Sequence, residues 1–518
     1  MKKKSAYAGI WDSAMIPSKA VQEQSAMLLI CSHWRQFYIP QIFLPLISTK
    51  ETLNFSKNFQ EKKQQVKPKA INLTEGNVTK NLLLFAIPIL LSNLFQQLYN
   101  AVDTMVVGKF AGSIALAAVG STSALICLLI DFFLGIATGA GILYAMHYGA
   151  GDYKGLKKLI DSSVIIAITV SIVIMAIGIG FSDKLLSMMN IPGEVLGEAK
   201  DYFVIYLYGT LPMLIYNIGA GLIRAEGDSS RPLIYLVISG VINMIVDIVL
   251  VAGFDLGTKG AAWATVASQI IAAILVMIRL TKLNDIYAWR PLKMQPDKLT
   301  IWDITRISVP CGLSHTMFNF ANLIIQTKIN SFGAIAMAGT AAYNKIDSFM
   351  YMPMSALCLA TSTFVGQNVG AGKFSRIKEG IKASAIAGVL ATFTLMAIVF
   401  VFFKPLMSLF TADEEVISYA RIMMLYLVPF TWIYAIADTL TGAIRGAGQA
   451  TQVTVILAIT ICVCRLAWLA IALPIKNEIN IVFMSYPISW TLCTLTMIWY
   501  FFKRSTVYKT IKSCEDIE

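Results

Sequence analysis

The chain has 518 residues, of which 57% are hydrophobic and only 14% are charged, and its mean hydropathy is +0.67. Soluble domains carry about 25% charged residues, so this composition excludes an ordinary soluble protein. The net charge of +12 does not indicate a nucleic-acid partner, because Lys and Arg gather in particular loops between apolar stretches. These stretches continue for about 20 residues without alternating, which predicts an all-α polytopic membrane protein and excludes a β-barrel.

Cysteine and histidine usage indicates neither a disulfide framework nor a metal site. The eight cysteines show no paired spacing beyond Cys462 and Cys464, which lie inside an apolar stretch, and the chain has three scattered histidines. Buried cysteines of this kind behave as small hydrophobic residues. No clustered His, Ser or metal-ligand set lies near a predicted membrane face, so we expect neither an enzyme nor a bound cofactor.

Residues 1–70 are polar and basic and hold no stretch long enough to span a bilayer, so we expect a disordered N-terminal extension. Twelve apolar segments follow, at residues 81–107, 114–147, 158–181, 196–223, 232–253, 259–280, 304–330, 336–366, 378–402, 415–442, 452–473 and 480–502. The first six predict an N-lobe over residues 71–280 and the second six a C-lobe over 303–505. A connector at 281–302 and a tail at 506–518 complete the chain.

Loop charge predicts the orientation of these segments. Lys and Arg concentrate in five loops that fall on one membrane face when the chain crosses twelve times; they include Lys154, Lys157, Lys158, Arg224, Arg231, Lys282, Arg290, Lys293, Lys298, Lys373, Arg376, Lys378, Lys503, Arg504 and Lys509. The loops of the opposite face are poor in basic residues. The positive-inside rule therefore places both termini in the cytoplasm. We expect the protein to be a multi-pass protein of the plasma (inner) membrane.

The two halves of the chain repeat each other. Residues 149–153 recur at 370–374, and residues 221–227 recur at 442–448, both at a shift of 221. Pro88 and Ser92 match Pro310 and Ser314 at a shift of 222, so one residue slips near Gly112. Six helices per repeat give both halves the same orientation, which predicts two six-helix lobes related by a pseudo-two-fold axis along the membrane normal. Two facing bundles of this kind suit alternating access better than a permanent pore.

The first segment carries a polar stripe although it is long enough to cross the bilayer. Asn93, Gln96, Asn100 and Asp103 are spaced by three and four residues and so share one helical face. A carboxylate inside a membrane helix costs about 2.5 to 3.5 kcal/mol on insertion scales, so such residues usually serve a function. We therefore expect this helix to line a polar cavity, with Asp103 as its reactive group.

The fifth segment supplies a second membrane-embedded acid. Ser239, Asn243 and Asp247 lie four residues apart on one face, whereas the repeat places Cys464 and Trp468 at the positions of Asn243 and Asp247. Asp103 likewise corresponds to Ile325, so this acid pair is confined to the N-lobe. The plain alternative is that each acid only forms hydrogen bonds within the bundle.

Two chemistries remain open for a shared pocket of these acids. Desolvation and mutual repulsion would favour the protonated form of at least one carboxyl group near neutral pH, which suits proton transfer. Alternatively, two carboxylates, Asn243 and a hydroxyl such as Thr265 would offer oxygen ligands to Na⁺. No ATP-binding motif accompanies the glycine-rich loops, so uphill transport would have to use an ion gradient.

Weaker candidates for a substrate cavity combine polar, aromatic and acidic residues within the apolar segments. Polar stripes on segments one and seven face each other across the predicted lobes, Tyr99 could stack on an aromatic cation, and two acids of the second half could attract cations. Asp131 could join the N-lobe acids or face water near a helix end. The expected cavity residues are Gln96, Tyr99, Asn100, His315, Asn319, Asp347 and Asp438.

The motifs in these segments resemble those of the multidrug and toxic compound extrusion (MATE) family, and most of all its bacterial DinF-like branch. They are Gln97-Leu-Tyr-Asn100-Ala-Val-Asp103, Arg224-Ala-Glu-Gly-Asp228, Asn243-Met-Ile-Val-Asp247 and Gly260-Ala-Ala-Trp-Ala-Thr265. The resemblance covers roughly residues 72 to 505. It implies cation-coupled efflux by a rocker-switch between outward-facing and inward-facing V shapes.

The resemblance also implies an ion site in the N-lobe. DinF-like relatives use an aspartate on the first helix, an asparagine and an aspartate four apart on the fifth, and a threonine on the sixth; the matching residues are Asp103, Asn243, Asp247 and Thr265. NorM-like relatives place acids on their seventh and tenth helices, whereas here segment seven has none and segment ten offers only Asp438. This difference favours the N-lobe site, with H⁺ or Na⁺ as the coupling ion.

Our first hypothesis is therefore a monomeric H⁺- or Na⁺-coupled antiporter that exports small organic compounds, cationic or aromatic in character. The alternative is a flippase for lipid-linked oligosaccharides or other lipids from the same superfamily. Such a flippase would need a cationic cavity for diphosphate, whereas the membrane-embedded charges recognised from sequence are mostly acids. A channel is a further possibility, but the repeat and the buried acids favour a carrier.

Overall fold

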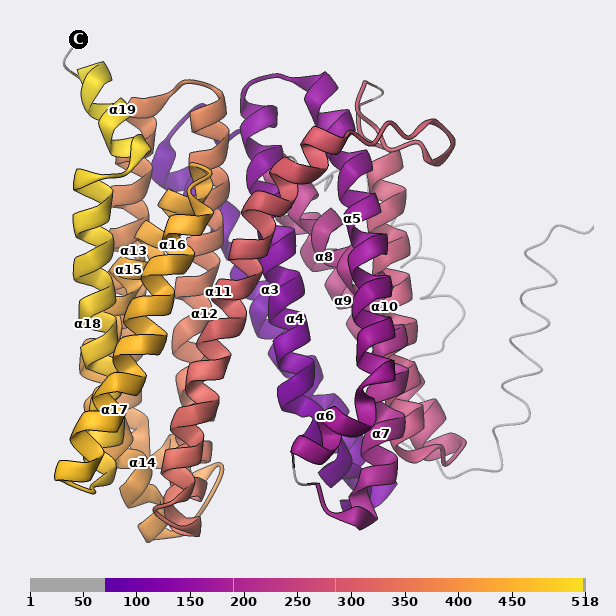
Figure 1. Ribbon diagram of the computed structural model, residues 1–518, viewed down its shortest axis with the longest axis vertical. Helices are drawn as coiled ribbons and strands as arrows, with labels where there is room; N and C mark the ends of the chain where they lie inside the picture. Colours follow the sequence, from indigo (N-terminus) through magenta and orange to yellow (C-terminus); the bar gives the residue numbers. More distant parts are fainter. Residues whose placement is uncertain (1–69, 190, 285, 516–518) are drawn as a thin grey trace, which may run out of the picture. The chain divides into compact units, whose positions relative to one another are not determined.

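The computed structural model describes residues 70–189, 191–284 and 286–515, and these ranges contain helices, turns and no β-strand (Figure 1). The expected extension at 1–70 lies outside the described residues up to residue 69. The first half contains α3 (Val78–Val106), α4 (Gly112–Gly149), α5 (Tyr153–Gly180), α6 (Ser182–Met188), α7 (Gly193–Tyr208), α8 (Thr210–Ala225), α9 (Ser230–Asp247) and α10 (Gly257–Thr281). The second half contains α11 (Lys298–Asn330), α12 (Ala334–Gly370), α13 (Phe374–Ser408), α14 (Glu414–Leu427), α15 (Thr431–Gly446), α16 (Ala450–Leu457), α17 (Cys464–Ile475), α18 (Ile479–Lys503) and α19 (Thr506–Glu515).

Several spans consist of two helical pieces. The helices α7 and α8 are bent by 46° at Gly209, and a 3₁₀ turn containing Pro429 separates α14 from α15. The π-helical segments η4 (Ile248–Gly253) and η7 (Ala458–Val463) extend α9 and join α16 to α17, and η3 (Val107–Ala111) follows α3. Such wide turns often occur at functional sites.

The described residues form twelve spans in two lobes, as the sequence predicts. Nine helical stretches in these ranges are long and apolar enough to cross a bilayer, and the bent pair α7–α8 makes a tenth. One of the nine, Val78–Gly149, consists of two spans, α3 and α4. Gly112, with a φ of +87°, separates them. The twelfth span is α11, which is 33 residues long. It is not among the nine apolar stretches because it carries a polar stripe.

Helix ends lie within a few residues of the expected ones, and the largest differences have local causes. Helix α11 begins at Lys298, six residues before the expected start, because the Asp297 side chain accepts a hydrogen bond from the Thr300 backbone N–H at 3.0 Å. This is the usual N-cap interaction, which satisfies a free donor of the first turn. The helix therefore starts inside the polar connector.

Glycine contacts show the pseudo-two-fold relation between the lobes directly. A Cβ on Gly149 would lie 2.0 Å from the carbonyl oxygen of Gln367, and a Cβ on Gly370 would lie 1.9 Å from that of Met146. The repeat relates these two contacts, because Gln367 lies 221 positions after Met146 and Gly370 lies 221 positions after Gly149. Only glycine permits such a close approach of the backbones of α4 and α12.

These contacts lie at the membrane face that carries the loops after α4, α8, α10, α12 and α18, here called the basic-loop face. Residues 71–77, here called the strap, join both lobes at this face. The Ile71 N–H donates to the Gly227 carbonyl at 3.0 Å. On the other lobe, Asn368 donates to the Leu73 carbonyl at 3.2 Å, and Lys373 donates to that of Thr74 at 2.9 Å.

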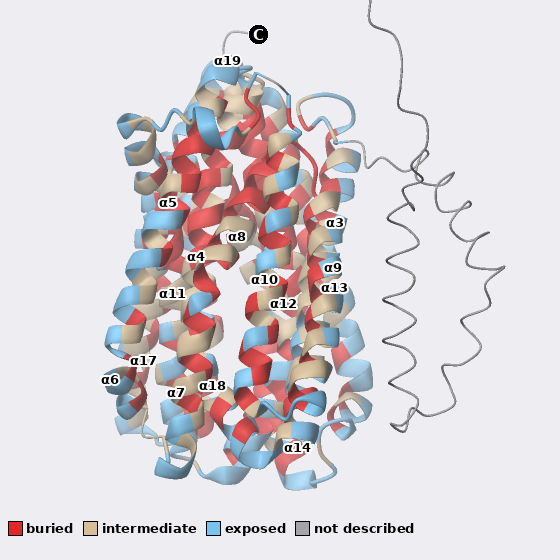
Figure 2. Cartoon of the chain, turned by 90° about the vertical axis from the view of Figure 1, so that its right-hand side faces the viewer, coloured by how far each residue is buried: buried red, intermediate tan, exposed pale blue. Residues whose placement is uncertain are grey.

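Burial separates the inside of each lobe from its outer surface. Buried residues gather where helices face one another, and exposed residues cover the outer helix faces (Figure 2). Many of the exposed residues are large and apolar, including Ile177 at 54% exposure and Leu390 at 61%. Such a continuous apolar surface suits contact with lipid tails rather than with water.

Candidate functional site

The structure brings Asp103 and Asp247 together. Helices α3 and α9 run in the same direction and pack closely where a Cβ on Gly240 would lie 2.7 Å from Cε1 of Phe95. Asp103 lies eight residues beyond Phe95 and Asp247 seven beyond Gly240, about two helical turns in each case. The two carboxyl groups consequently lie close to each other and interact electrostatically.

Three of the four oxygens of this acid pair are buried without a donor from the described residues. Within the described residues, no N–H or O–H group reaches Oδ1 of Asp103, either carboxyl oxygen of Asp247, or the amide oxygen of Asn243, although all are buried. A carboxylate only accepts hydrogen bonds, so two neighbouring carboxylates repel each other unless a proton, a cation or another donor lies between them. The unpartnered carboxylate and amide oxygens fit both H⁺ and a hard cation such as Na⁺.

Thr265 lies in the same layer without a polar contact to the acids. Its hydroxyl donates to the Ala261 carbonyl of its own helix at 3.2 Å. Ala261 packs in a buried cluster with Val106 of α3 and Val251 of η4, which places this part of α10 beside the helices that carry the acids. Of the four expected ion-site residues, the structure therefore joins Asp103 and Asp247, with Asn243 one turn below on the same buried face.

Three tyrosines lie near the acid pair, and two of them, Tyr202 and Tyr206, were not predicted from the sequence. Both acids interact electrostatically with Tyr99 of α3 and with Tyr202 of α7. The Tyr202 ring centroid lies 6.3 Å from that of Tyr206. The available signal was their four-residue spacing on the fourth span, which puts both rings on one helix face.

A central cavity of about 330 Å³ lies between the lobes, and an adjoining pocket of about 260 Å³ extends into the C-lobe. Gln96 and Tyr99 line the cavity, His315 and Asp438 line both spaces, and Asn319 lines the pocket. Tyr99 thus connects the cavity to the acid pair. The remaining two expected residues line neither space: Asn100 is exposed on α3, and Asp347 is buried against the Tyr343 hydroxyl at 3.4 Å.

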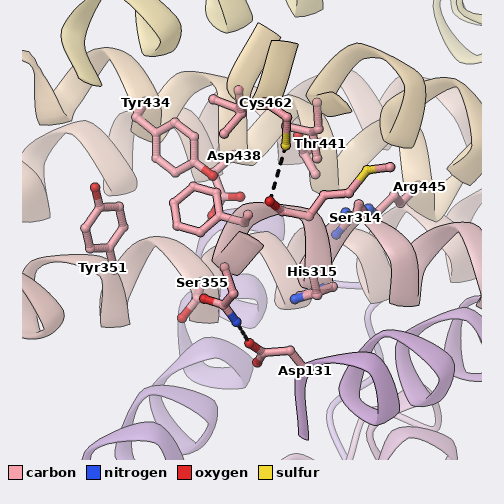
Figure 3. Close-up of a pocket in the computed structure, with 15 residues that line it drawn as sticks. Asp131, Ser314, His315, Tyr351, Ser355, Tyr434, Asp438, Thr441, Arg445 and Cys462 are labelled. Atoms are coloured by element: carbon pink, nitrogen blue, oxygen red, sulfur yellow. Dashed lines mark hydrogen bonds between the residues drawn. The ribbon is translucent and has the colours of Figure 1, made fainter. Parts of the chain in front are cut away.

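Asp131 belongs to the interface between the lobes. The Asn319 amide of α11 donates to its carboxylate across that interface (the lower dashed line in Figure 3). In the same view Asp131 extends from a helix of the first half, whereas Asp438 and Arg445 extend from the second half. Asp131 therefore faces the cavity and lies apart from the Asp103–Asp247 pair.

The structure adds two arginines to the acids that the sequence placed in the membrane. Arg224 and Arg445 line the cavity together with Asp131 and Asp438, so its wall carries both signs. The sequence placed Arg224 in a loop because it ends an apolar segment, whereas α8 continues to Ala225. The repeat that relates Arg224 to Arg445 was the available signal for the pair.

A third arginine replaces the acids in the C-lobe. Arg465 is 1% exposed and lies one residue after Cys464, the repeat counterpart of Asn243. Its guanidinium stacks on Tyr486 at 4.5 Å from the ring centroid and donates to Ser489 Oγ and to Asn322 Oδ1. The C-lobe thus holds a fixed cation where the N-lobe holds unpartnered acids, which makes the two lobes chemically unequal.

Twelve spans in two lobes around a cavity of mixed charge define a polytopic membrane transporter. The sequence matches the MatE family model at residues 88–249 and 310–470, more than half of the chain, and the protein belongs to this family of MATE transporters. The two matched ranges begin 222 residues apart and end 221 apart, in agreement with the repeat and its single slip.

Similar proteins include several bacterial ones named for drug resistance. The probable multidrug resistance protein YoeA of Bacillus subtilis (strain 168) is 29% identical over 449 residues, 83% of this chain and 94% of the relative. The probable multidrug resistance protein NorM of Thermotoga maritima is 26% identical, with coverages of 75% and 84%. A solved structure of an outward-facing multidrug resistance MATE family transporter of the MOP superfamily has a TM-score of 0.78 at 20% identity, with coverages of 86% and 99%.

Proposed function

We propose that this protein is an H⁺- or Na⁺-coupled antiporter that exports small organic compounds by alternating access. The observation that carries the proposal is the buried Asp103–Asp247 pair, because Oδ1 of Asp103 and both carboxyl oxygens of Asp247 find no donor in the described residues. Such a pair binds a cation and releases it when its surroundings change. The relatives named as multidrug resistance proteins support drug-like substrates, and we propose no catalytic activity.

The arrangement of the lobes supports a rocker-switch in the plasma (inner) membrane. The glycine contacts and the strap close the basic-loop face, which the positive-inside rule assigns to the cytoplasm together with both termini. Export then requires these contacts to break and equivalent contacts to form at the opposite face. A gradient of 100 mV supplies about 2.3 kcal/mol per charge for this cycle.

Tyr99 gives a physical route for coupling. It lines the cavity and lies one turn before Asp103 on α3, so a change at the acids reaches the cavity wall directly. A cation at the acid pair removes their mutual repulsion and allows α3 and α9 to approach. Substrate in the cavity and cation at the pair would then favour different positions of α3, which is the requirement for antiport.

A lipid flippase of the same superfamily remains a second candidate. Its supporting observation is the pair Arg224 and Arg445, which gives the cavity the cationic groups that a lipid phosphate needs. The solved structure of a MOP superfamily transporter from Pyrococcus furiosus has the same fold, with a TM-score of 0.77 at 19% identity. For that protein, a reverse polarity of the binding pocket is said to suggest a different function. The acid pair has no place in that alternative.

Transport into everted membrane vesicles tests the proposal. H⁺ and Na⁺ gradients are imposed separately, and ethidium uptake is followed by fluorescence in vesicles with and without the protein. We expect uptake that saturates with ethidium concentration and depends on one of the two gradients. Flux that rises linearly with concentration under both conditions would indicate a channel, and no gradient-dependent uptake of any dye would remove the antiport proposal.

A further inference from the structure

Arg224 and Arg445 occupy equivalent places in the two lobes. A Cβ on Gly221 would lie 2.9 Å from the Ala137 carbonyl oxygen, and a Cβ on Gly442 would lie 2.4 Å from that of Cys358. Cys358 and Gly442 stand 221 positions after Ala137 and Gly221, so α8 packs on α4 as α15 packs on α12. Almost one turn after each glycine an arginine emerges, and both arginines line the same cavity.

Neither guanidinium forms a salt bridge with a carboxylate of the described residues, although Asp438 interacts electrostatically with Arg445 in the same cavity. The Nε of each arginine is buried without a hydrogen-bond partner among these residues. Arg445 is 6% exposed, and one of its terminal nitrogens donates to Ser314 Oγ at 2.6 Å. Burying a guanidinium whose N–H donors are unpaired costs free energy unless an anion accepts hydrogen bonds from them.

Helix capping does not account for the pair. Each arginine lies in the last turn of its helix, where a cation interacts favourably with the helix dipole. A capping arginine would donate to the terminal backbone carbonyls, whereas Arg445 donates to a serine of α11 and both side chains line the cavity. Two other polar atoms of the cavity wall, Gln269 Oε1 and Ser362 Oγ, are also buried without a hydrogen-bond partner among the described residues. This part of the wall is therefore polar, and several of its hydrogen-bonding groups are unpaired.

We propose that Arg224 and Arg445 form a two-point subsite for the anionic group of the substrate. A planar guanidinium from each lobe suits a carboxylate or a phosphate, because both groups accept paired hydrogen bonds. The acids Asp131 and Asp438 line the same cavity, so the preferred substrate carries a cationic part as well. This inference rests on the proposed function and narrows its substrates to compounds of mixed charge.

Binding of two dyes that differ in one charge tests the subsite without any ion gradient. The probes are a rhodamine with a free carboxylate and the methyl ester of the same dye, and their affinities for the purified protein in lipid nanodiscs are measured by fluorescence anisotropy. We expect the double variant Arg224→Gln, Arg445→Gln to lose about tenfold or more in affinity for the carboxylate dye. Its affinity for the ester should change less than twofold, which also shows that the variant is folded.

Two further variants serve as controls. The Arg421→Gln variant removes an exposed arginine of α14 outside the cavity and should bind both dyes as the wild type does. The Arg224→Lys, Arg445→Lys variant keeps the charge and should retain part of the preference for the carboxylate. Equal losses for both dyes in the Gln variant would indicate a structural role for the arginines, and unchanged affinities would also overturn the subsite.

Competition distinguishes the possible sources of the anion. Displacement of the carboxylate dye by benzoate assigns the subsite to free small compounds, and displacement only by short-chain phosphatidic acid assigns it to lipid headgroups. Either result supports an anion subsite, whereas displacement by neither contradicts it. Because no gradient is involved, failure of this test is separate from failure of the antiport assay.

Discussion

At the scale of single residues, Asp103 and Asp247 were predictable because the cost of a membrane-embedded acid makes each one conspicuous. The repeat added that the counterparts are Ile325 and Trp468, and the structure places the two acids side by side. Tyr202, Arg224 and Arg445 were harder to predict, because aromatic residues usually only pack and because an arginine at a segment end resembles a loop charge. Their roles depend on which helix faces the cavity, and sequence spacing alone does not determine this.

The N-cap of α5 offers a residue-scale prediction on pH. The Gly155 N–H donates to Asp152 Oδ1 at 2.9 Å and His147 Nδ1 lies 2.9 Å from Oδ2; these contacts hold the pKa of the Asp152 carboxyl below its usual value. A lowered pKa stabilises the fold above the unfolded-state value of about 3.9, and this contribution is lost as the pH falls through the lower folded-state pKa. We expect Asp152→Asn to lower the melting temperature at pH 6.

The difference in melting temperature between wild type and Asp152→Asn should also depend on pH. Melting temperatures of wild type and Asp152→Asn should converge as the pH falls from about 4 through the lower folded-state pKa, because the wild-type carboxylate becomes protonated over that range. The second repeat serves as an internal comparison, since Lys373 occupies the equivalent position and caps α13 with no side-chain hydrogen bond. A difference in melting temperature that stays constant across this range would contradict the assignment.

At the scale of elements, the helices followed from composition and the breaks within them did not. Twelve apolar segments were visible because each must satisfy its backbone hydrogen bonds internally to cross a bilayer. The π-helical segment η4 begins directly after Asp247, and η3 begins four residues after Asp103. These wider turns depend on the packing of neighbouring helices, which no local pattern reveals.

The reciprocal contact of α4 and α12 leads to an element-scale prediction. Gly149→Ala and Gly370→Ala each place a Cβ within about 2 Å of a carbonyl oxygen of the other lobe, so each should open the basic-loop face. We expect longer distances between spin labels at Lys154 and Glu379, both exposed on that face, measured by double electron–electron resonance in a cysteine-free background. Both variants should act alike, because the two contacts are related by the repeat.

A glycine without neighbours supplies the control for this measurement. Gly120 lies on the same helix α4 with nothing within 4 Å of an added Cβ, so Gly120→Ala should leave the distances unchanged. If Gly149→Ala and Gly370→Ala also leave them unchanged, the contact does not hold the face closed.

At the scale of the whole molecule, the repeat predicted two lobes, and the structure shows how differently they are equipped. Among the described residues, the N-lobe holds an acid pair with three oxygens that lack a donor, whereas the C-lobe holds Arg465 against the rings of Phe318 and Tyr486. The cavity between the lobes is lined by acids and by arginines. The strap was not predictable from sequence, because residues 71–77 have no pattern that indicates contacts with Asn368 and Lys373 about 300 positions away. The central claim is that the N-lobe acid pair couples ion movement to export.

Dye efflux from proteoliposomes tests that claim most directly. H⁺ and Na⁺ gradients are imposed separately on wild type, Asp103→Asn, Asp247→Asn and the matched control Asp347→Asn, whose buried acid lies outside both the pair and the cavity. We predict gradient-driven efflux in the wild type and in Asp347→Asn, and a loss of at least tenfold in each N-lobe variant at equal protein content. Efflux at the wild-type rate in Asp103→Asn and Asp247→Asn would contradict the assignment of the coupling site.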